Sequence, residues 1–146
     1  MTIADAASAR AEAAAAAMWA RDRASAGLGM VLDHVGPGTA TLSMQVDAHM
    51  LNGHETCHGG FVFALADSAF AFACNSDGTG SVAAQCAIAY LRPAHAGETL
   101  VATALERHRE GRSGIYDVRV TAGEAVVAEF RGHSRTTAHR WVPDEA

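Results

Sequence analysis

The stretch from Phe61 to Ser76 most constrains the fold, because it carries a single charged residue, Asp67, among Phe, Ala, Leu and Val side chains. These apolar residues are spread around the whole circumference of a helix, so the helix is expected to be buried on nearly all sides. Gly59 and Gly60 mark its start, and a cluster of helix-breaking residues follows it. The rest of the chain is therefore predicted to surround this helix.

Six segments with strand character flank the helix, two before it and four after it. The segment from Thr39 to Asp47 alternates apolar and polar residues, as a half-buried strand does, and the turn Gly36-Pro37-Gly38 joins it to the preceding strand as a hairpin. The predicted strands span residues 30–35, 39–47, 82–91, 99–107, 115–121 and 126–134. We predict an α+β fold of the hotdog type, an antiparallel sheet of about six strands wrapped around one long hydrophobic helix.

The two ends of the chain differ in character. The Ala-rich segment from Asp5 to about Ser25 favours an N-terminal helix, which is expected to pack against the body or line a substrate channel. A polar tail is expected to fray from about Thr137. We expect an N-terminal helix at residues 1–27, a hotdog domain at 28–137 and a tail at 138–146.

The composition argues against several classes of protein. The net charge is −5 and the 11 basic residues, all Arg, are scattered, so nucleic acid is not an expected partner. No stretch is apolar over the length of a membrane span, and charges interrupt the N-terminal segment where a signal peptide needs an apolar core. Cys57, Cys74 and Cys86 are an odd number without CxxC spacing, which favours a reducing cytoplasm over a disulfide framework.

Asp67 is the first candidate for a catalytic residue. A lone ionised carboxylate in an apolar helix is costly unless it is paired, hydrogen-bonded or protonated, and an Arg partner or a polar seam is the structural alternative. Gly59 and Gly60 place unpaired N–H groups and the positive end of the helix dipole where a ligand can approach. Such groups can stabilise an oxyanion, although a glycine pair can also simply open a helix.

The distance between these groups predicts an assembly. Asp67 lies seven residues beyond Gly60, which is about 10 Å along the same helix axis. A general base or nucleophile must lie about 3 Å from the atom that the N–H groups hold, so one chain cannot place both on one carbonyl. We predict that Asp67 meets Gly59 and Gly60 of a second chain across a twofold dimer interface, which creates two equivalent sites.

Four segments resemble one family of enzymes: MLNGHETCHGGFVFALADSAFAFACNS, LRPAHAGETLVATA, GIYDVRV and EFRGHSR. In order and spacing, over about residues 29–135, they resemble the hotdog-fold hydroxyphenylacetyl-CoA thioesterases of phenylacetate degradation. The resemblance implies a homotetramer of dimers that hydrolyses phenylacetyl-CoA and ring-hydroxylated phenylacetyl-CoA to the free acid and CoA. It implies no metal and no cofactor, because coenzyme A is part of the substrate.

The resemblance also assigns roles to residues of the long motif. It places the catalytic carboxylate on Asp67, the oxyanion glycine on Gly59 with Gly60 adjacent, and the motif histidine on His58. Asp67 would activate water or attack directly to form a mixed anhydride. His58 would hydrogen-bond the substrate or Asn52, or only hold the turn.

The remaining assignments concern the water and the coenzyme. By the same resemblance, Asn52 falls on the family's asparagine position, where it would orient the catalytic water or the thioester, and Ser68 keeps a hydroxyl beside the carboxylate where relatives often carry Thr. The phosphates of CoA need cationic or N–H partners near the mouth of the site. The candidates for that contact are Arg92, Arg112, Arg131, His133 and Arg135.

Three other readings of the motif stay open. His54, Cys57 and His58 are close enough to suggest a metal site, but the chain supplies no clear fourth ligand. A hotdog dehydratase or hydratase would pair His58 with Asp67, although the carboxylate eight positions after Gly59 fits the thioesterase pattern better. A non-catalytic acyl-CoA-binding module would lose no function when Asp67 is removed.

Overall fold

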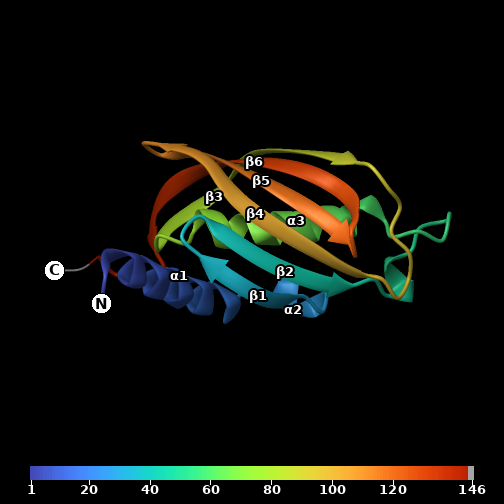
Figure 1. The fold of residues 1–146 in the computed structure, drawn as a ribbon, viewed down its shortest axis with the longest axis horizontal. Helices are drawn as coiled ribbons and strands as arrows, with labels where there is room; N and C mark the ends of the chain where they lie inside the picture. The colour runs from blue at the N-terminus through green and yellow to red at the C-terminus, as the bar shows by residue number, and fades with distance from the viewer. Residues whose placement is uncertain (145–146) are drawn as a thin grey trace.

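The computed structural model describes residues 1–144 and shows a six-stranded antiparallel sheet curved around one helix (Figure 1). The strand order is β1-β2-β4-β5-β6-β3. The elements are α1 (Ile3–Trp19), α2 (Arg23–Gly27), β1 (Val31–Gly36), β2 (Thr39–Gln45), the 3₁₀-helix η1 (Ala48–Met50), α3 (Gly59–Cys74), β3 (Thr79–Tyr90), β4 (Thr99–Glu110), β5 (Ser113–Ala122) and β6 (Ala125–Arg140). The predicted α+β hotdog fold and its hairpin β1–β2 are confirmed.

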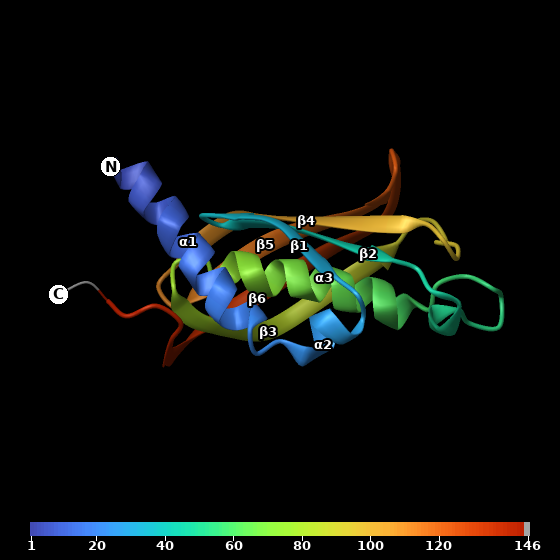
Figure 2. The same ribbon diagram turned by 90° about the horizontal axis from the view of Figure 1, so that it is seen from below.

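The core lies between α3 and the concave face of the sheet (Figure 2). The ring of Phe70 on α3 packs against Tyr116 and Phe130, with ring centroids 5.6 and 5.8 Å apart. A glycine at position 132 lets this ring reach the backbone of β6, since a Cβ there would lie 2.7 Å from Phe70. Neither α3 nor any other helix within residues 1–144 is long and apolar enough to cross a membrane.

One stripe of α3 departs from the prediction that the helix is buried on nearly all sides. Ala64, Asp67, Ser68 and Ala71 are only half-buried, while the residues that face the sheet are fully buried. The reason is that β1 and β3 are the two edges of an open sheet and do not pair with each other beneath the helix. The catalytic candidate therefore lies on the side of the helix that the sheet leaves uncovered.

The predicted N-terminal helix is confirmed as α1, but the prediction that it extends to about Ser25 is wrong, because α1 ends at Trp19 and a second helix, α2, follows. The side chain of Asp22 accepts a hydrogen bond from the backbone N–H of Ser25 at 2.9 Å and so caps the start of α2. Such a side-chain-to-backbone bond competes with continuation of the first helix. The break lets Ser25 reach α3, where its hydroxyl lies 2.8 Å from that of Ser68.

The prediction that the chain frays from about Thr137 is also wrong, because β6 continues to Arg140. The hydroxyl of Thr137 donates a hydrogen bond to the carbonyl of Gly80 on β3, at 2.9 Å. Beyond the strand, Arg10 of α1 donates to the carbonyl of Val142 at 3.3 Å. The C-terminal segment is thus held by β3 on one side and by α1 on the other.

The edge strand β3 is unusually apolar for an exposed edge. It pairs with β6 alone, and no charged residue occurs between Val82 and Tyr90. Val82, Tyr90 and the following Leu91 are 55%, 52% and 60% exposed. Monomeric proteins usually protect an edge strand with charged residues, proline or a β-bulge. Without such protection, its unpaired backbone N–H and C=O groups pair readily with a strand of another molecule.

Candidate active site

Asp67 lies near the middle of α3 and faces a cavity of about 400 Å³ between α3, the start of β3 and the C-terminal segment. Burial raises the pKa of this carboxyl above its usual 3.8, and the negative charge of Asp22 raises it further. No side chain within residues 1–144 forms an ion pair or a hydrogen bond with the carboxylate. The alternative in which an Arg neutralises Asp67 therefore finds no support in the described chain.

The thiol of Cys74 lies in the same cavity and does not compete with Asp67 as a nucleophile. Burial, followed by the charge of Asp67, raises the pKa of Cys74 to about 12. Since the thiolate is the nucleophilic form, the sulfur is inert at neutral pH. Of these two neighbouring groups, Asp67 is therefore the one able to take a proton or attack a carbonyl.

The N-terminus of α3 distinguishes the two predicted oxyanion glycines. Nδ1 of His58 accepts a hydrogen bond from the N–H of Gly60 at 3.1 Å, so His58 caps the helix and occupies that donor. The N–H of Gly59 donates to no acceptor within residues 1–144. The geometry leaves Gly59 as the open donor, and it gives His58 the role of holding the turn.

Gly59 sits against the aromatic ring of Tyr90. The Tyr90 hydroxyl donates to the carbonyl of Gly59 at 2.9 Å, and a Cβ on Gly59 would lie 3.0 Å from the ring carbon Cζ. Both residues line a second pocket of about 370 Å³, together with Leu91 and Arg92. A Cβ at this position would require the exposed Tyr90 ring to shift by a few tenths of an ångström.

Asn52 organises the loop that leads into the helix. Its Oδ1 accepts from the backbone N–H of His54 at 2.9 Å and from the hydroxyl of Thr56 at 3.2 Å. Its side-chain NH₂ group donates to nothing within residues 1–144, so it is the part of the residue that is free to meet a ligand.

The hydroxyl of Ser68 points to α2 rather than to the neighbouring carboxylate. It lies 2.8 Å from the hydroxyl of Ser25, which in turn donates to Asp22 at 2.7 Å. Ser68 therefore joins α3 to α2 and holds Asp22 close to the carboxyl of Asp67.

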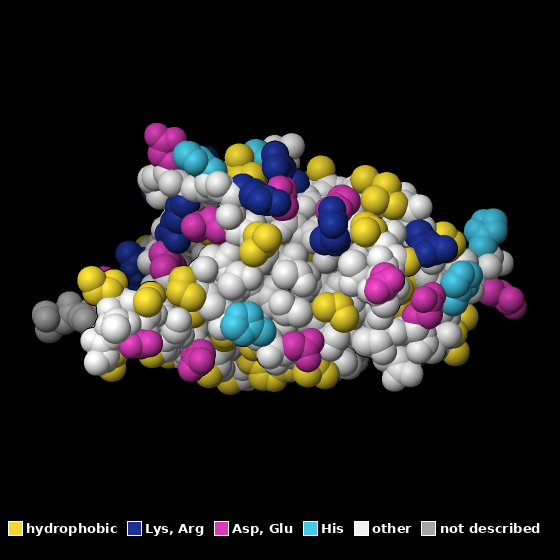
Figure 3. Space-filling model, viewed as in Figure 1, with side chains coloured by type: hydrophobic (Ala, Val, Ile, Leu, Met, Phe, Trp, Pro, Cys, Tyr) yellow, Lys and Arg dark blue, Asp and Glu magenta, His cyan; other side chains and the backbone are white. Residues whose placement is uncertain are grey.

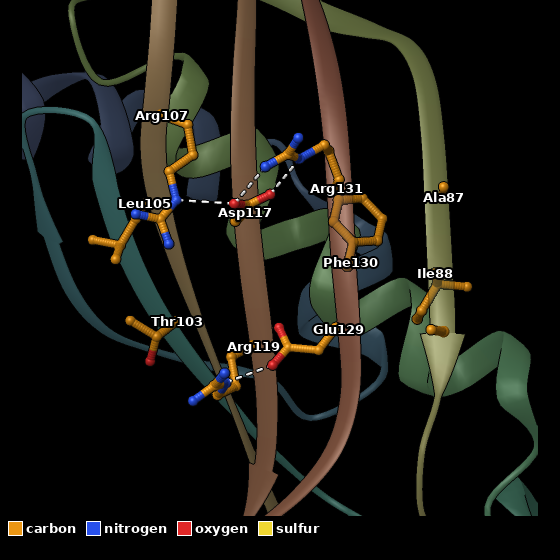
Figure 4. Close-up of a pocket in the computed structure, with 11 residues that line it drawn as sticks. Ala87, Ile88, Thr103, Leu105, Arg107, Asp117, Arg119, Glu129, Phe130 and Arg131 are labelled. Atoms are coloured by element: carbon orange, nitrogen blue, oxygen red, sulfur yellow. Dashed lines mark hydrogen bonds and ion pairs between the residues drawn. The ribbon is translucent and has the colours of Figure 1, made fainter.

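The residues predicted to bind CoA phosphates are dispersed. Arg131 is held by Asp117 at 2.6 Å on the convex face of the sheet, beside Arg107, which also pairs with Asp117 (Figure 4). Over this face, Arg side chains alternate with Asp and Glu (Figure 3). Arg112 donates to the carbonyl of Thr136 at 2.9 Å.

The remaining two of these residues, His133 and Arg135, line a separate groove beside the turn between β4 and β5. Of the five, Arg92 lines a pocket together with a predicted catalytic residue, Gly59. The structure therefore associates one of the five residues with the oxyanion end of the site.

The two halves of the predicted site lie apart in one chain. The cavity of Asp67 and the pocket of Gly59 have no lining residue in common. His58 belongs to the Gly59 end, so the pairing of His58 with Asp67 that a dehydratase needs does not form within the chain. Within residues 1–144, no group of three His, Cys, Asp or Glu side chains is arranged to hold a metal ion.

Sequence reasoning missed several residues that line the two pockets. Tyr90 was part of a predicted strand without a role, and Trp141 lay in the predicted tail. A signal for Trp141 was present, since a large aromatic side chain in an otherwise polar tail usually finds a partner. Met18 of α1 also lines the Asp67 cavity, in agreement with the expectation that the N-terminal helix packs on the body or lines a channel.

Comparison with known proteins identifies the family. The acyl-coenzyme A thioesterase PaaI of Escherichia coli is 48% identical over 119 residues, which cover 81% of this chain and 85% of that protein. The solved structure of the E. coli PaaI protein from the phenylacetic acid degradation operon superposes with a TM-score of 0.89 at 44% identity, covering 91% of this chain and 97% of that one.

A more distant relative of known structure, a Streptococcus mutans protein bound to acetyl CoA, superposes with a TM-score of 0.73 at 26% identity and covers 76% of this chain and 90% of that one. The family model described as the thioesterase superfamily matches residues 54–129, which contain the whole of α3 and the five residues before it, His54 to His58. With its hotdog sheet, its half-buried carboxylate and its open helix N-terminus, the chain belongs to the thioesterase superfamily.

Proposed function

We propose that the protein is an acyl-CoA thioesterase that hydrolyses phenylacetyl-CoA and ring-hydroxylated phenylacetyl-CoA. The observation that carries the proposal is the unpaired carboxyl of Asp67, whose pKa is raised by burial in a cavity large enough for an acyl group. The names of the E. coli relative and of its operon support the acyl-CoA substrate and the aromatic acid.

In the proposed reaction, the N–H of Gly59 donates to the thioester carbonyl oxygen, where negative charge develops. Asp67 removes a proton from water, and the resulting hydroxide attacks the carbonyl carbon to form a tetrahedral intermediate. The carbon–sulfur bond then breaks and releases the carboxylic acid, and the departing CoA thiolate takes up the proton that Asp67 removed from water, which restores the carboxylate. In the alternative route, Asp67 attacks the carbonyl itself, expels the thiolate and forms a mixed anhydride that water hydrolyses.

The apolar edge strand β3 supports a site shared between two subunits. In a twofold antiparallel pairing of two β3 strands, the Val82 end of one strand lies beside the Tyr90 end of the other. Val82 lines the cavity of Asp67, whereas Tyr90 lines the pocket of Gly59. This pairing would bring Asp67 of one subunit towards Gly59 of the partner subunit, and it would cover the apolar edge.

The proposal retains two expectations from the sequence. The family resemblance predicts that two such dimers form a homotetramer. The cytoplasm is the expected location, because CoA thioesters are the proposed substrates and Cys57, Cys74 and Cys86 are free thiols.

A thiol-release assay tests the proposed function. We expect the purified protein to release free CoA from phenylacetyl-CoA and from 4-hydroxyphenylacetyl-CoA, and to add no water to an enoyl-CoA in a parallel assay. Hydration of the enoyl thioester without thiol release would instead identify a dehydratase or hydratase. Binding of acyl-CoA with neither reaction would identify a non-catalytic module.

The pH dependence of kcat/KM tests the electrostatic setting of Asp67. The base must be ionised, so kcat/KM should fall as the pH drops through the raised pKa of Asp67. Asp22 is one cause of that raised pKa, so Asp22→Asn should move the acid limb to lower pH. Asn keeps an Oδ1 acceptor for the N–H of Ser25, which preserves the cap of α2.

The control for this experiment is Asp47→Asn, the same change at an exposed residue whose side chain makes no capping bond. We expect its pH profile to match that of the wild type. If the acid limb of the kcat/KM profile stays at the same pH or moves to higher pH in Asp22→Asn, the electrostatic coupling of Asp22 and Asp67 is contradicted.

A further inference from the structure

The cavity that Asp67 faces has walls suited to an aromatic ring. The rings of Phe70, His139 and Trp141 line it, and Met18 adds a thioether. His139 packs edge-on against Trp141, with ring centroids 4.5 Å apart and an interplanar angle of 81°. Aromatic rings prefer such edge and offset contacts, and sulfur also packs favourably against them.

The charged residues that line the Asp67 cavity and the Gly59 pocket indicate which of the two receives the CoA end of the substrate and which receives the acyl end. No Arg lines the Asp67 cavity, and the chain contains no Lys, so this cavity offers the phosphates of CoA no permanent cation. Arg92 does line the pocket of Gly59. Phosphates bind where cationic donors are available, so the CoA end belongs on the Gly59 side and the acyl end in the Asp67 cavity.

The indole of Trp141 is held in place by a buried amide. Its N–H donates to Oδ1 of Asn75 at 3.0 Å. The same Asn75 side chain accepts from the backbone N–H of Ser81 at 2.7 Å and donates to the carbonyl of Ala71 at 2.8 Å. One side chain therefore ties together the end of α3, the start of β3 and the C-terminal segment.

The backbone around Trp141 is fixed as well. The N–H of Trp141 donates to the carbonyl of Gly78 at 2.8 Å, and Arg10 of α1 holds the carbonyls of Val142 and Pro143. A ring that is already ordered loses little freedom when a ligand binds against it, so its contact energy is retained in binding.

Building on the proposed thioesterase function, we propose that the Asp67 cavity is the acyl pocket and that Trp141 is a specificity-determining residue that selects aryl over linear acyl groups. The indole forms the wall against which the aryl ring packs while the thioester carbonyl stays near Asp67. The C-terminal segment, which lies beyond the matched family region of residues 54–129, thereby determines which acyl groups react.

The test compares kcat/KM for phenylacetyl-CoA with kcat/KM for hexanoyl-CoA. We expect the wild type to prefer phenylacetyl-CoA. Trp141→Leu keeps an apolar side chain but removes the ring, and should lower the aryl-to-linear ratio about tenfold. Trp141→Phe keeps a ring without the N–H group, and should keep the ratio within about threefold of the wild type.

The matched control is Trp19→Leu, the same change at the other tryptophan of the chain. Trp19 packs against Phe72, with centroids 6.1 Å apart, and faces a groove between α1 and β1 rather than the Asp67 cavity. The aryl-to-linear ratio of kcat/KM in Trp19→Leu should equal that of the wild type.

The outcomes separate this inference from the function on which it rests. No thiol release by the wild type from any acyl-CoA would contradict the thioesterase itself. Thiol release with the same ratio in Trp141→Leu as in the wild type would overturn only the role of Trp141. A wild type that prefers hexanoyl-CoA would also overturn the aryl pocket, whether or not the variants fold.

Discussion

Asp67→Asn is expected to lower kcat/KM for phenylacetyl-CoA by about three orders of magnitude. Asn has nearly the same shape as Asp, but it neither accepts a proton from water nor attacks a thioester. Because no side chain within residues 1–144 is bonded to the carboxylate, the substitution breaks no structural contact there. The thiol-release assay measures the loss directly, with Asp47→Asn as the control that should keep full activity.

The same substitution should stabilise the fold at neutral pH. The pKa of Asp67 is higher in the folded protein than its usual 3.8, so the folded state disfavours the ionised carboxylate. Stability is lost as the pH rises through this raised pKa, and no loss remains below pH 3.8, where Asp67 is protonated in both states.

Thermal unfolding at several pH values measures this effect. Asp67→Asn, which stays neutral, should show a higher Tm than the wild type at pH 7 to 8, with a difference that shrinks in acid. An inactive variant with a lower Tm would mean that Asp67 holds the structure rather than the chemistry. A variant that keeps its activity would contradict the catalytic assignment.

Mixing two inactive variants is expected to restore activity if the site is shared. Gly59→Ala should lose about a hundredfold in kcat/KM, because the added methyl group would press on the Tyr90 ring, 3.0 Å away, beside the N–H that holds the carbonyl oxygen. In a heterodimer of Asp67→Asn and Gly59→Ala, one site carries both changes and the other carries neither. Random assortment of equal amounts should therefore recover about a quarter of the wild-type sites.

The measurement uses differently tagged subunits expressed together, so that the heterodimer can be isolated and assayed. The controls are each variant expressed with a tagged copy of itself, which should stay inactive. A heterodimer as inactive as its parents would contradict the shared site, because a site contained within one subunit is defective in both chains. A fully active monomer would contradict it equally.

The sequence alone determined the elements that follow from local pattern. The period of the apolar residues distinguished α3 from the strands, and glycines marked the hairpin turn before β2. The lone charge on an apolar helix made Asp67 the catalytic candidate, because burial of a carboxylate is costly wherever that helix packs. The spacing of Asp67 and Gly60 along one helix axis also required no tertiary information, since an α-helix has a constant rise per residue.

Only the tertiary structure decided how distant segments meet. It placed β3 at the sheet edge, left the N–H of Gly59 open while His58 capped Gly60, and brought Trp141 to Asn75 across 66 residues. Periodicity records which face of an element is buried, but not which neighbour buries it. Contacts between side chains far apart in sequence depend on the packing of the whole chain, so the wall of the acyl pocket emerged only with the fold.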